Sequence, residues 1–222
     1  MTQFASDPSL ALAPGLADPL IREAHCDDLA QLGDLLTSSF YDRSGWMRWV
    51  YPVIKLGILE DLRQRLKSQK PNYACLTALY TGFSQVSKQG LAPGIVVGTA
   101  EVSQRQAWPW QGLEPRYAYV SNLAVGSAFR RRGVASALLA TCEQLALDWQ
   151  VYDLYLHVME DNVEARRLYH KAGFRLFEAE DTPASWFGLQ PRRLLMYKLL
   201  APSHPSGDAD KTRDHRVTSH NP

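Results

Sequence analysis

Two short segments of this chain carry residue types suited to binding an anion and moving a proton. In the first, residues 130–135, three arginines precede Gly133, after an apolar run at 118–125 and before a helix-forming stretch. The start of a helix presents backbone N–H groups without a helical partner, and the helix dipole adds about half a positive charge there. Gly133 lets a phosphate approach without a side chain in the way. This segment therefore predicts a pyrophosphate site.

The second segment, residues 162–174, reads as a helix that places polar groups on one face. Asn162, Ala165 and Tyr169 are spaced i, i+3 and i+7, which puts them on the same side of a helix. Gly173 ends this helix before the next strand. A phenol can donate a proton, but a helical tyrosine with this spacing is also common in core packing. The order of the two segments along the chain distinguishes these readings.

That order resembles the GNAT N-acetyltransferase superfamily. Its pattern is a strand, an Arg-x-x-Gly-x-Ala turn, a helix, a strand and then Asn-x-x-Ala-x-x-Leu-Tyr-x-x-x-Gly-Phe, and the likeness extends over about residues 95–200. Residues 40–66 are similar to the plastid and cyanobacterial branch, whose members acetylate protein N-termini and lysines. The resemblance implies an α/β fold with a mostly antiparallel sheet of about seven strands, splayed between the fourth and fifth strands and flanked by about four helices.

The resemblance also implies that acetyl-CoA is the acetyl donor, that no metal takes part, and that Tyr169 is the general acid for the departing thiolate. The strand before the turn would lend backbone groups to the pantetheine arm, the turn would hold the pyrophosphate, and the second helix would flank the lower pantetheine. The implied contacts are Leu123, Ala124 and Val125; Arg131, Arg132, Gly133, Val134, Ala135 and Ser136; and Asn162, Val163, Glu164 and Tyr169.

The general base has two candidates. His157 lies five residues before Asn162, in Leu-His-Val, where the resemblance implies that several protein N-terminal acetyltransferases carry their base. An imidazole, with an unperturbed pKa of about 6.5, accepts a proton near neutral pH. Tyr119 is the second candidate, four residues before Leu123. The structural alternative for His157 is a strand histidine hydrogen-bonded in the core, and for Tyr119 it is a strand aromatic that packs.

The implied function is acetyl transfer to a primary amine by direct attack in a ternary complex, the amine being a protein N-terminus or a lysine. Two alternatives stay open: an enzyme that acetylates a small amine, and a non-catalytic regulator that binds acyl-CoA. The chain lacks an acidic cluster for a polycation. Four tryptophans either line a peptide groove or form a buried aromatic cluster: Trp46, Trp49, Trp108 and Trp110.

Composition limits the partners and the location. The chain has 222 residues, 45% of them hydrophobic, enough for one domain, and its net charge of +1 gives no support to binding of nucleic acid or membrane. Three dispersed cysteines indicate neither a disulfide framework nor a zinc site. The first nineteen residues contain two aspartates and no lysine or arginine, which argues against a secretory signal or a transit peptide. We therefore expect a cytoplasmic protein, either a monomer or a weak homodimer.

The elements that position these residues follow from periodicity. A GNAT domain is expected at 20–200, between flexible tails at 1–19 and 201–222, the second of which holds three histidines in a solvated stretch. β-branched and aromatic runs predict the strands, and apolar residues at helical spacing predict the helices. The expected strands are 20–23, 73–80, 95–103, 118–125, 151–158, 174–179 and 193–200. The expected helices are 27–40, 54–66, 135–149 and 162–172.

Overall fold

The structure, a computed structural model, describes residues 19–40, 47–68, 70–80, 94–107, 114–181 and 191–201, without the side chains of residues 40 and 47–55. The strands are β1 Leu20–Glu23, β2 Tyr73–Tyr80, β3 Ile95–Gln106, β4 Arg116–Val125, β5 Asp153–Met159, β6 Arg175–Glu180 and β7 Arg193–Leu199. The helices are α1 Leu29–Phe40, α2 Met47–Lys67, α3 Val134–Asp148 and α4 Val163–Lys171, with short 3-10 turns η1 Cys26–Asp28 and η3 Ser127–Phe129.

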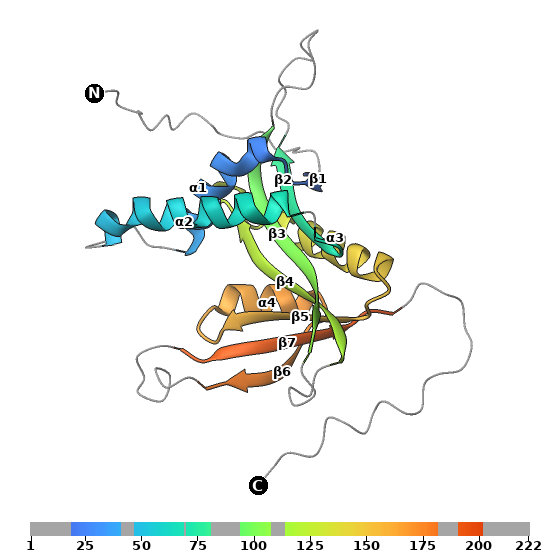
Figure 1. Cartoon of the computed structure of the whole chain (residues 1–222). Coiled ribbons are helices and arrows are strands. Elements are labelled where there is room, and N and C mark those ends of the chain that lie inside the picture. Colours follow the sequence, from blue (N-terminus) through green and yellow to red (C-terminus); the bar gives the residue numbers. More distant parts are fainter. Residues whose placement is uncertain are drawn as a thin grey trace, which may run out of the picture.

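The strands form one seven-stranded sheet in the order β1-β2-β3-β4-β5-β7-β6 (Figure 1). Neighbours are antiparallel except β4 and β5, which are parallel. The predicted mixed α/β sheet is confirmed. Two boundaries differ most from expectation: β3 continues to Gln106, and α2 begins at Met47, before Pro52. Pro52 is the sixth residue of α2, where its missing N–H removes one helical hydrogen bond, and α2 continues through Pro52 instead of starting after it.

Helices cover both faces of the sheet. Along β2, the buried side chains of Ala74, Leu76 and Ala78 join one core with α3, whereas Cys75 and Leu79 join a second core with α1 and α2. This alternation follows from the two-residue period of a strand. One apolar face of α3 is buried in the first core: Leu138, Leu139, Cys142 and Ala146 are all at most 1% exposed. Burial of one leucine side chain contributes about 1.5–3 kcal/mol.

A bulge in β4 separates this strand from β5. Asn122 has a left-handed φ of 52°, and the register between β3 and β4 slips between Thr99 and Glu101. β4 pairs with β5 only from Ala118 to Val120, although β4 continues to Val125. Figure 1 shows β4 curving from the half of the sheet under α1 and α2 to the half formed by β5, β7 and β6. The splay expected between the fourth and fifth strands is present.

Candidate active site

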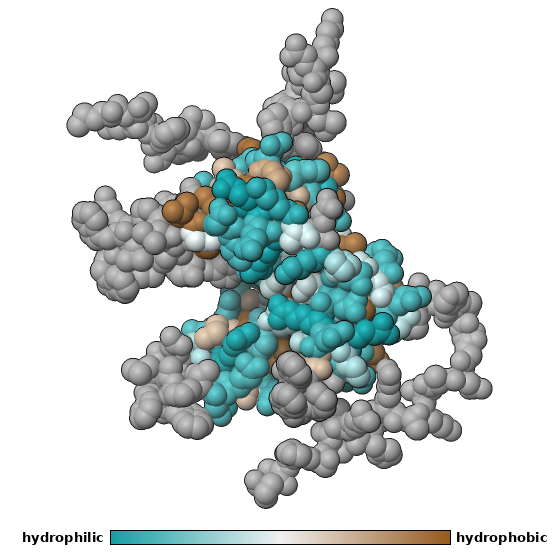
Figure 2. All heavy atoms as spheres, viewed as in Figure 1, coloured by the Kyte–Doolittle hydropathy of each residue, from teal (hydrophilic) through white to brown (hydrophobic). Residues whose placement is uncertain are grey.

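The separation of β4 and β5 leaves two unpaired strand edges, which we call the fork: residues 121–125 of β4 and 157–159 of β5. One edge of β4 is paired here with β3, through Gly98 with Val125 and Thr99 with Ala124. Within the described residues no strand pairs with the other edge beyond Val120. Unpaired strand edges bind extended chains that carry amide groups. Leu123, Ala124 and Val125 are therefore placed to offer backbone groups along the fork. Figure 2 shows the same side of the molecule, with a largely hydrophilic surface hollowed between the part over α2 and the part over β5, β7 and β6.

The predicted anion turn lies between β4 and α3. Arg131 and Gly133 have φ values of 62° and 81°, so left-handed residues shape the turn into a concave run of amides. The first amide of α3 with a helical partner is that of Ala137, which donates to Gly133 O over 2.9 Å. The three amides before it, from Val134 to Ser136, precede the first helical hydrogen bond, and no side chain caps this terminus. The turn thus has the geometry of an anion site.

Close packing beneath the turn fixes the position of α3. Val134 is 4% exposed, whereas Arg131, Arg132 and Ser136 are exposed and Ala135 is half-buried. Gly98 of β3 lies under Val134: a Cβ added there would come within 2.9 Å of Val134 Cγ1. The missing side chain at Gly98 therefore allows the first turn of α3 to rest on the sheet beside the fork.

The start of α4 lies across the fork from this turn. Asn162 precedes the helix instead of belonging to it, and its Oδ1 accepts a hydrogen bond from the amide of Ala165 over 3.1 Å. The prediction that the helix includes Asn162 is therefore wrong: this residue is the N-cap, whose backbone angles are non-helical. Val163 is exposed. Glu164 Oε1 accepts from Arg131 Nη2 over 2.7 Å, so an exposed ion pair joins α4 to the anion turn.

Tyr169 lies deeper, on α4. It is 7% exposed and packs edge-on against Phe174, with ring centroids 5.9 Å apart. Burial, and to a smaller extent the charge of Tyr119, raises the pKa of Tyr169 to about 12. Tyr169 belongs to the core with α3 and Tyr119 to a tyrosine cluster elsewhere in the sheet, yet the two phenols are close enough to interact electrostatically. Tyr169 keeps its proton at neutral pH and can donate it.

His157 and Tyr119 are in direct contact at the base of the fork. The Tyr119 hydroxyl and His157 Nδ1 are 2.6 Å apart, and the two rings are 5.6 Å apart between centroids. On the other side of the imidazole, Nε2 is 2.8 Å from Glu180 Oε1 of β6. Sequence reasoning missed Glu180, because β7 lies between β5 and β6 and nothing in the local pattern indicates a contact that crosses a strand.

The electrostatic environment keeps His157 neutral. Burial lowers the pKa of His157 below its usual value, and the hydrogen bond with Glu180 only partly offsets this shift. The positive charges of Arg193 and Arg105 lower the pKa further. The Arg105 guanidinium stacks on Tyr119, with its central carbon 3.7 Å from the ring centroid. A neutral imidazole with a phenol on one nitrogen can accept a proton near neutral pH.

Comparisons with known proteins identify the family of the chain. The model of the acetyltransferase (GNAT) family matches residues 34–174. The chain belongs to the GNAT family. Among curated GNAT relatives, GCN5-related N-acetyltransferase 10, chloroplastic, of Arabidopsis thaliana is 36% identical over 143 residues, which cover 64% of this chain and 55% of the relative. GCN5-related N-acetyltransferase 7, chloroplastic, of the same plant is 28% identical over 170 residues, covering 66% and 61%. The chain thus spans a little over half the length of these relatives.

Solved structures share the GNAT fold at low identity. Arabidopsis thaliana NAA60 in complex with a bisubstrate analogue has a TM-score of 0.59 at 18% identity, over 83% of this chain and 99% of that one. The ribosomal-protein-alanine N-acetyltransferase of Brucella melitensis has a TM-score of 0.56 at 22% identity, over 82% and 99%. At these identities the likeness concerns the fold.

The expected cytoplasmic location is contradicted by the GNAT relatives, four of which are named as chloroplastic. The expectation rested on the composition of residues 1–19, which lie outside the described residues except for the last. A compositional argument over so short a segment is weaker than relatedness over most of the domain.

The remaining candidate features of the GNAT chain are its cysteines, a metal or membrane site, its tryptophans and tail histidines, and one hollow. Burial raises the pKa of Cys75 and of Cys142 to about 12, so these thiols stay protonated. In the described ranges no cluster of His, Cys, Asp or Glu is arranged to hold a metal, and none of the helices has the length and apolarity to cross a membrane. The four tryptophans and the three histidines of the C-terminal tail, His204, His215 and His220, lie outside the residues with described side chains.

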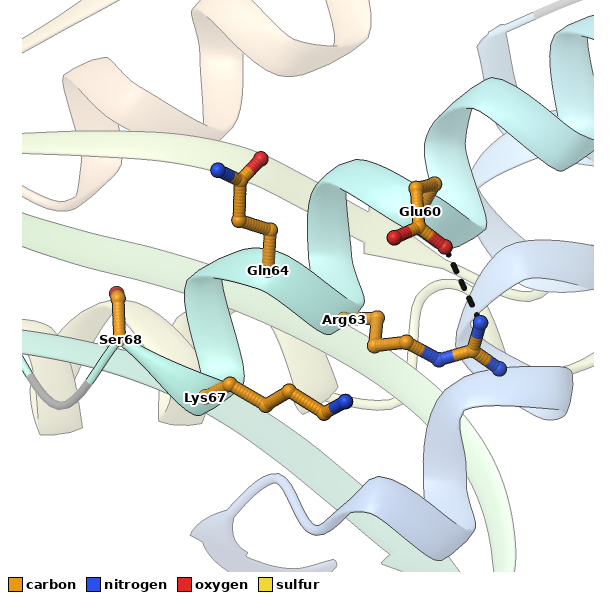
Figure 3. Close-up of a pocket in the computed structure, with 5 residues that line it drawn as sticks. All are labelled: Glu60, Arg63, Gln64, Lys67 and Ser68. Atoms are coloured by element: carbon orange, nitrogen blue, oxygen red, sulfur yellow. Dashed lines mark hydrogen bonds and ion pairs between the residues drawn. The ribbon is translucent and has the colours of Figure 1, made fainter.

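A hollow of about 530 Å³ runs along α2 (Figure 3), lined by Glu60, Arg63, Gln64, Lys67 and Ser68.

Proposed function

We propose that this protein transfers an acetyl group from acetyl-CoA to a primary amine, most readily the N-terminal α-amine of a protein or the ε-amine of a lysine. The observation that carries the proposal is the hydrogen bond between Tyr119 and His157 at the base of the fork. It supports acyl transfer because a proton acceptor lies there, within electrostatic reach of a proton donor, Tyr169.

The donor would lie along the fork. The amides at the start of α3 would hold the pyrophosphate, with Arg131 and Arg132 adding positive charge. The open edge at residues 121–125 would hydrogen bond the amide groups of the pantetheine arm in place of a neighbouring strand. Acetyl-CoA supplies an acyl carbon whose C–S bond breaks as the C–N bond to the amine forms.

The two proton transfers use opposite sides of the fork. As the amine attacks, its proton passes to the Tyr119 oxygen, directly or through a water, while the Tyr119 proton moves to His157 Nδ1. Tyr169 donates its proton to the departing sulfur, and its high pKa ensures that this proton is present at neutral pH. Among the neighbours of His157, Glu180 favours its protonation, whereas Arg193 and Arg105 oppose it.

The charges around His157 favour a peptide over a polyamine as the acceptor. Arg193 and Arg105 act on His157 from β7 and β3, and Glu180 is its acidic neighbour. A polycation would meet two guanidiniums for one carboxylate at this site. A peptide brings one reacting amine and an uncharged backbone, which this mixed environment tolerates.

The experiment compares three acceptors with acetyl-CoA: a peptide with a free N-terminus and no lysine, the same peptide with a blocked N-terminus and one lysine, and spermidine. Release of CoA thiol and mass spectrometry of the products measure transfer. We expect acetylation of one or both peptides, with spermidine the poorest acceptor. Binding of acetyl-CoA without transfer to any of them would instead favour the non-catalytic regulator, and preference for spermidine would favour a small-amine enzyme.

A further inference from the structure

We propose that Glu180 is a positioning residue of this site: its carboxylate holds His157 in the one neutral tautomer that can accept a proton through Tyr119. The inference rests on the proposed function and adds a third member to the pair at the fork. Glu180 comes from β6, which is separated from β4 in the sheet by two strands, β5 and β7, so only the folded chain brings the three side chains into line.

The hydrogen bonds around the ring determine which nitrogen carries the proton. A carboxylate has no proton to donate, so in its contact with Glu180 the Nε2 of His157 must be the donor. A neutral imidazole has only one N–H, and Nδ1 is therefore the acceptor. The Tyr119 hydroxyl, 2.6 Å from Nδ1, must then donate to it. This leaves the lone pairs of the Tyr119 oxygen directed away from His157 and available to the incoming amine or a water.

Glu180 also stabilises the product of proton transfer. When His157 takes the proton it becomes a cation, and a carboxylate 2.8 Å from Nε2 stabilises that cation. The positive groups that face His157 act in the opposite sense: Arg193 on β7 and Arg105 on β3 both oppose protonation. Arg193 Nε lies 3.9 Å from Glu180 Oε2 and so helps to hold the carboxylate in place.

A purely structural role makes different predictions. A carboxylate that only ties β6 to β5 would affect the free energy of unfolding, but its loss would leave the pH profile and the tautomer of His157 unchanged. Glu180 is 37% exposed, so replacement by the isosteric glutamine does not bury an unpaired group. Glu178, an exposed residue two positions earlier on β6, provides a matched control for the loss of one negative charge on the same strand.

The test compares wild type, Glu180→Gln, Glu180→Asp and Glu178→Gln in steady-state kinetics with the peptide acceptor, and in NMR of ¹⁵N-labelled histidine. A glutamine amide can accept from Nε2 or donate to it, so both tautomers of His157 become accessible in Glu180→Gln. We expect kcat to fall about tenfold or more, with little change in the Kd of acetyl-CoA. The acidic limb of the kcat/KM profile should move to lower pH, since removal of the negative charge lowers the pKa of His157. Glu180→Asp should recover part of the activity, and Glu178→Gln should match wild type.

The NMR measurement separates failure of this inference from failure of the proposed function. In wild type we expect the His157 nitrogens to report a proton on Nε2, and in Glu180→Gln a mixture of the two tautomers. Unchanged kcat, pH profile and tautomer in Glu180→Gln would overturn the role of Glu180 while leaving acetyl transfer intact. A wild-type protein that binds acetyl-CoA and acetylates no amine would overturn the proposed function, and with it the catalytic role of the hydrogen-bonded Tyr119, His157 and Glu180.

Discussion

The side-chain amide of Asn122 donates a hydrogen bond to the carboxylate of Glu101, over 2.8 Å between Nδ2 and Oε1. Asn122 is the left-handed residue of the β4 bulge, and Glu101 is 1% exposed on β3. The other carboxylate oxygen accepts from Arg65 of α2 over 2.7 Å. A buried carboxylate thus joins the bulge that opens the fork to a helix on the face of the sheet, and each of its two oxygens accepts a hydrogen bond.

Replacing Asn122 should close or distort the fork. Asn122→Gly keeps a residue that tolerates φ of 52° and loses the hydrogen bond, so we expect about 1–3 kcal/mol less stability. Asn122→Val adds the strain of a β-branched residue at positive φ and should cost about 1–3 kcal/mol more. Urea unfolding measures stability, and calorimetry should show weaker acetyl-CoA binding, more so for valine. If the valine variant bound acetyl-CoA as wild type does, the bulge would not shape the donor site.

Gly133 offers a test of the anion turn that separates charge from shape. Asparagine and aspartate tolerate left-handed backbone angles better than other residues with a side chain, and a Cβ at Gly133 meets no atom within 4 Å. Gly133→Asn and Gly133→Asp should therefore both fold. The aspartate would place a negative charge where the pyrophosphate is proposed to lie, so its Kd for acetyl-CoA should rise far more than that of the asparagine variant, and more at low salt. Equal affinities for the two variants would contradict a phosphate site there.

Tyr169→Phe keeps the ring that packs on Phe174 and removes the proposed acid. Turnover should fall by about 10²-fold or more, while the Kd of acetyl-CoA and the melting temperature change little. The acidic limb of the pH profile should stay, because the pKa of Tyr169 is raised far above that range. Normal turnover in this variant would assign the tyrosine to packing alone.

The pH dependence of acetyl transfer should report the protonation state of His157. Burial lowers the pKa of His157, so the midpoint of the acidic limb of kcat/KM should lie below about pH 6.5. His157→Gln should reduce turnover and remove this limb. Because the acceptor amine also titrates, the profile is measured with two peptides whose N-terminal amines differ in pKa. A limb that follows the peptide and persists in His157→Gln would make the histidine structural.

Asp28, in the 3-10 turn η1 between β1 and α1, should make the free energy of unfolding depend on pH. Burial raises the pKa of Asp28, but the hydrogen bonds from Arg22 and from the His25 amide outweigh it, so that the net pKa lies below the usual value. A lowered pKa stabilises the folded protein above the unfolded value of about 3.9, and this contribution is lost as the pH falls through the folded value. Chemical unfolding between pH 3 and 6 should show a smaller pH dependence for Asp28→Asn than for wild type, whereas Asp27→Asn, at an exposed neighbour, should behave as wild type. Identical curves for both variants would mean that the Arg22 pair contributes no pH-dependent stability.

Local patterns were enough to predict most elements of the fold and the turn at which the pyrophosphate is proposed to bind. The strand and helix periods, Gly133 before α3 and Gly173 after α4 are encoded over a few residues, because a side chain's direction repeats every two or 3.6 residues. The residue type of Asn162 also favours an N-cap, although the spacing pattern predicts a helix that includes this residue. Two predictions were wrong: that α2 begins after Pro52, and that the protein is cytoplasmic. A single proline does not fix where a helix begins, and the composition of a short terminal segment does not fix a location.

Only the tertiary structure decided which side chains meet. His157 was a candidate from the sequence, but its contacts with Tyr119 and Glu180 span 38 and 23 residues and depend on the register of four strands. Glu101 and Asn122 meet only because a bulge shifts the register of β3 against β4. Strand pairing is a global property, in which a slip of one residue turns every side chain to the other face. The sequence by itself therefore determined the elements and the glycine turn before α3 of this GNAT protein, whereas the packing of the whole sheet determined the fork and the alignment of the proposed proton-transfer groups at its base.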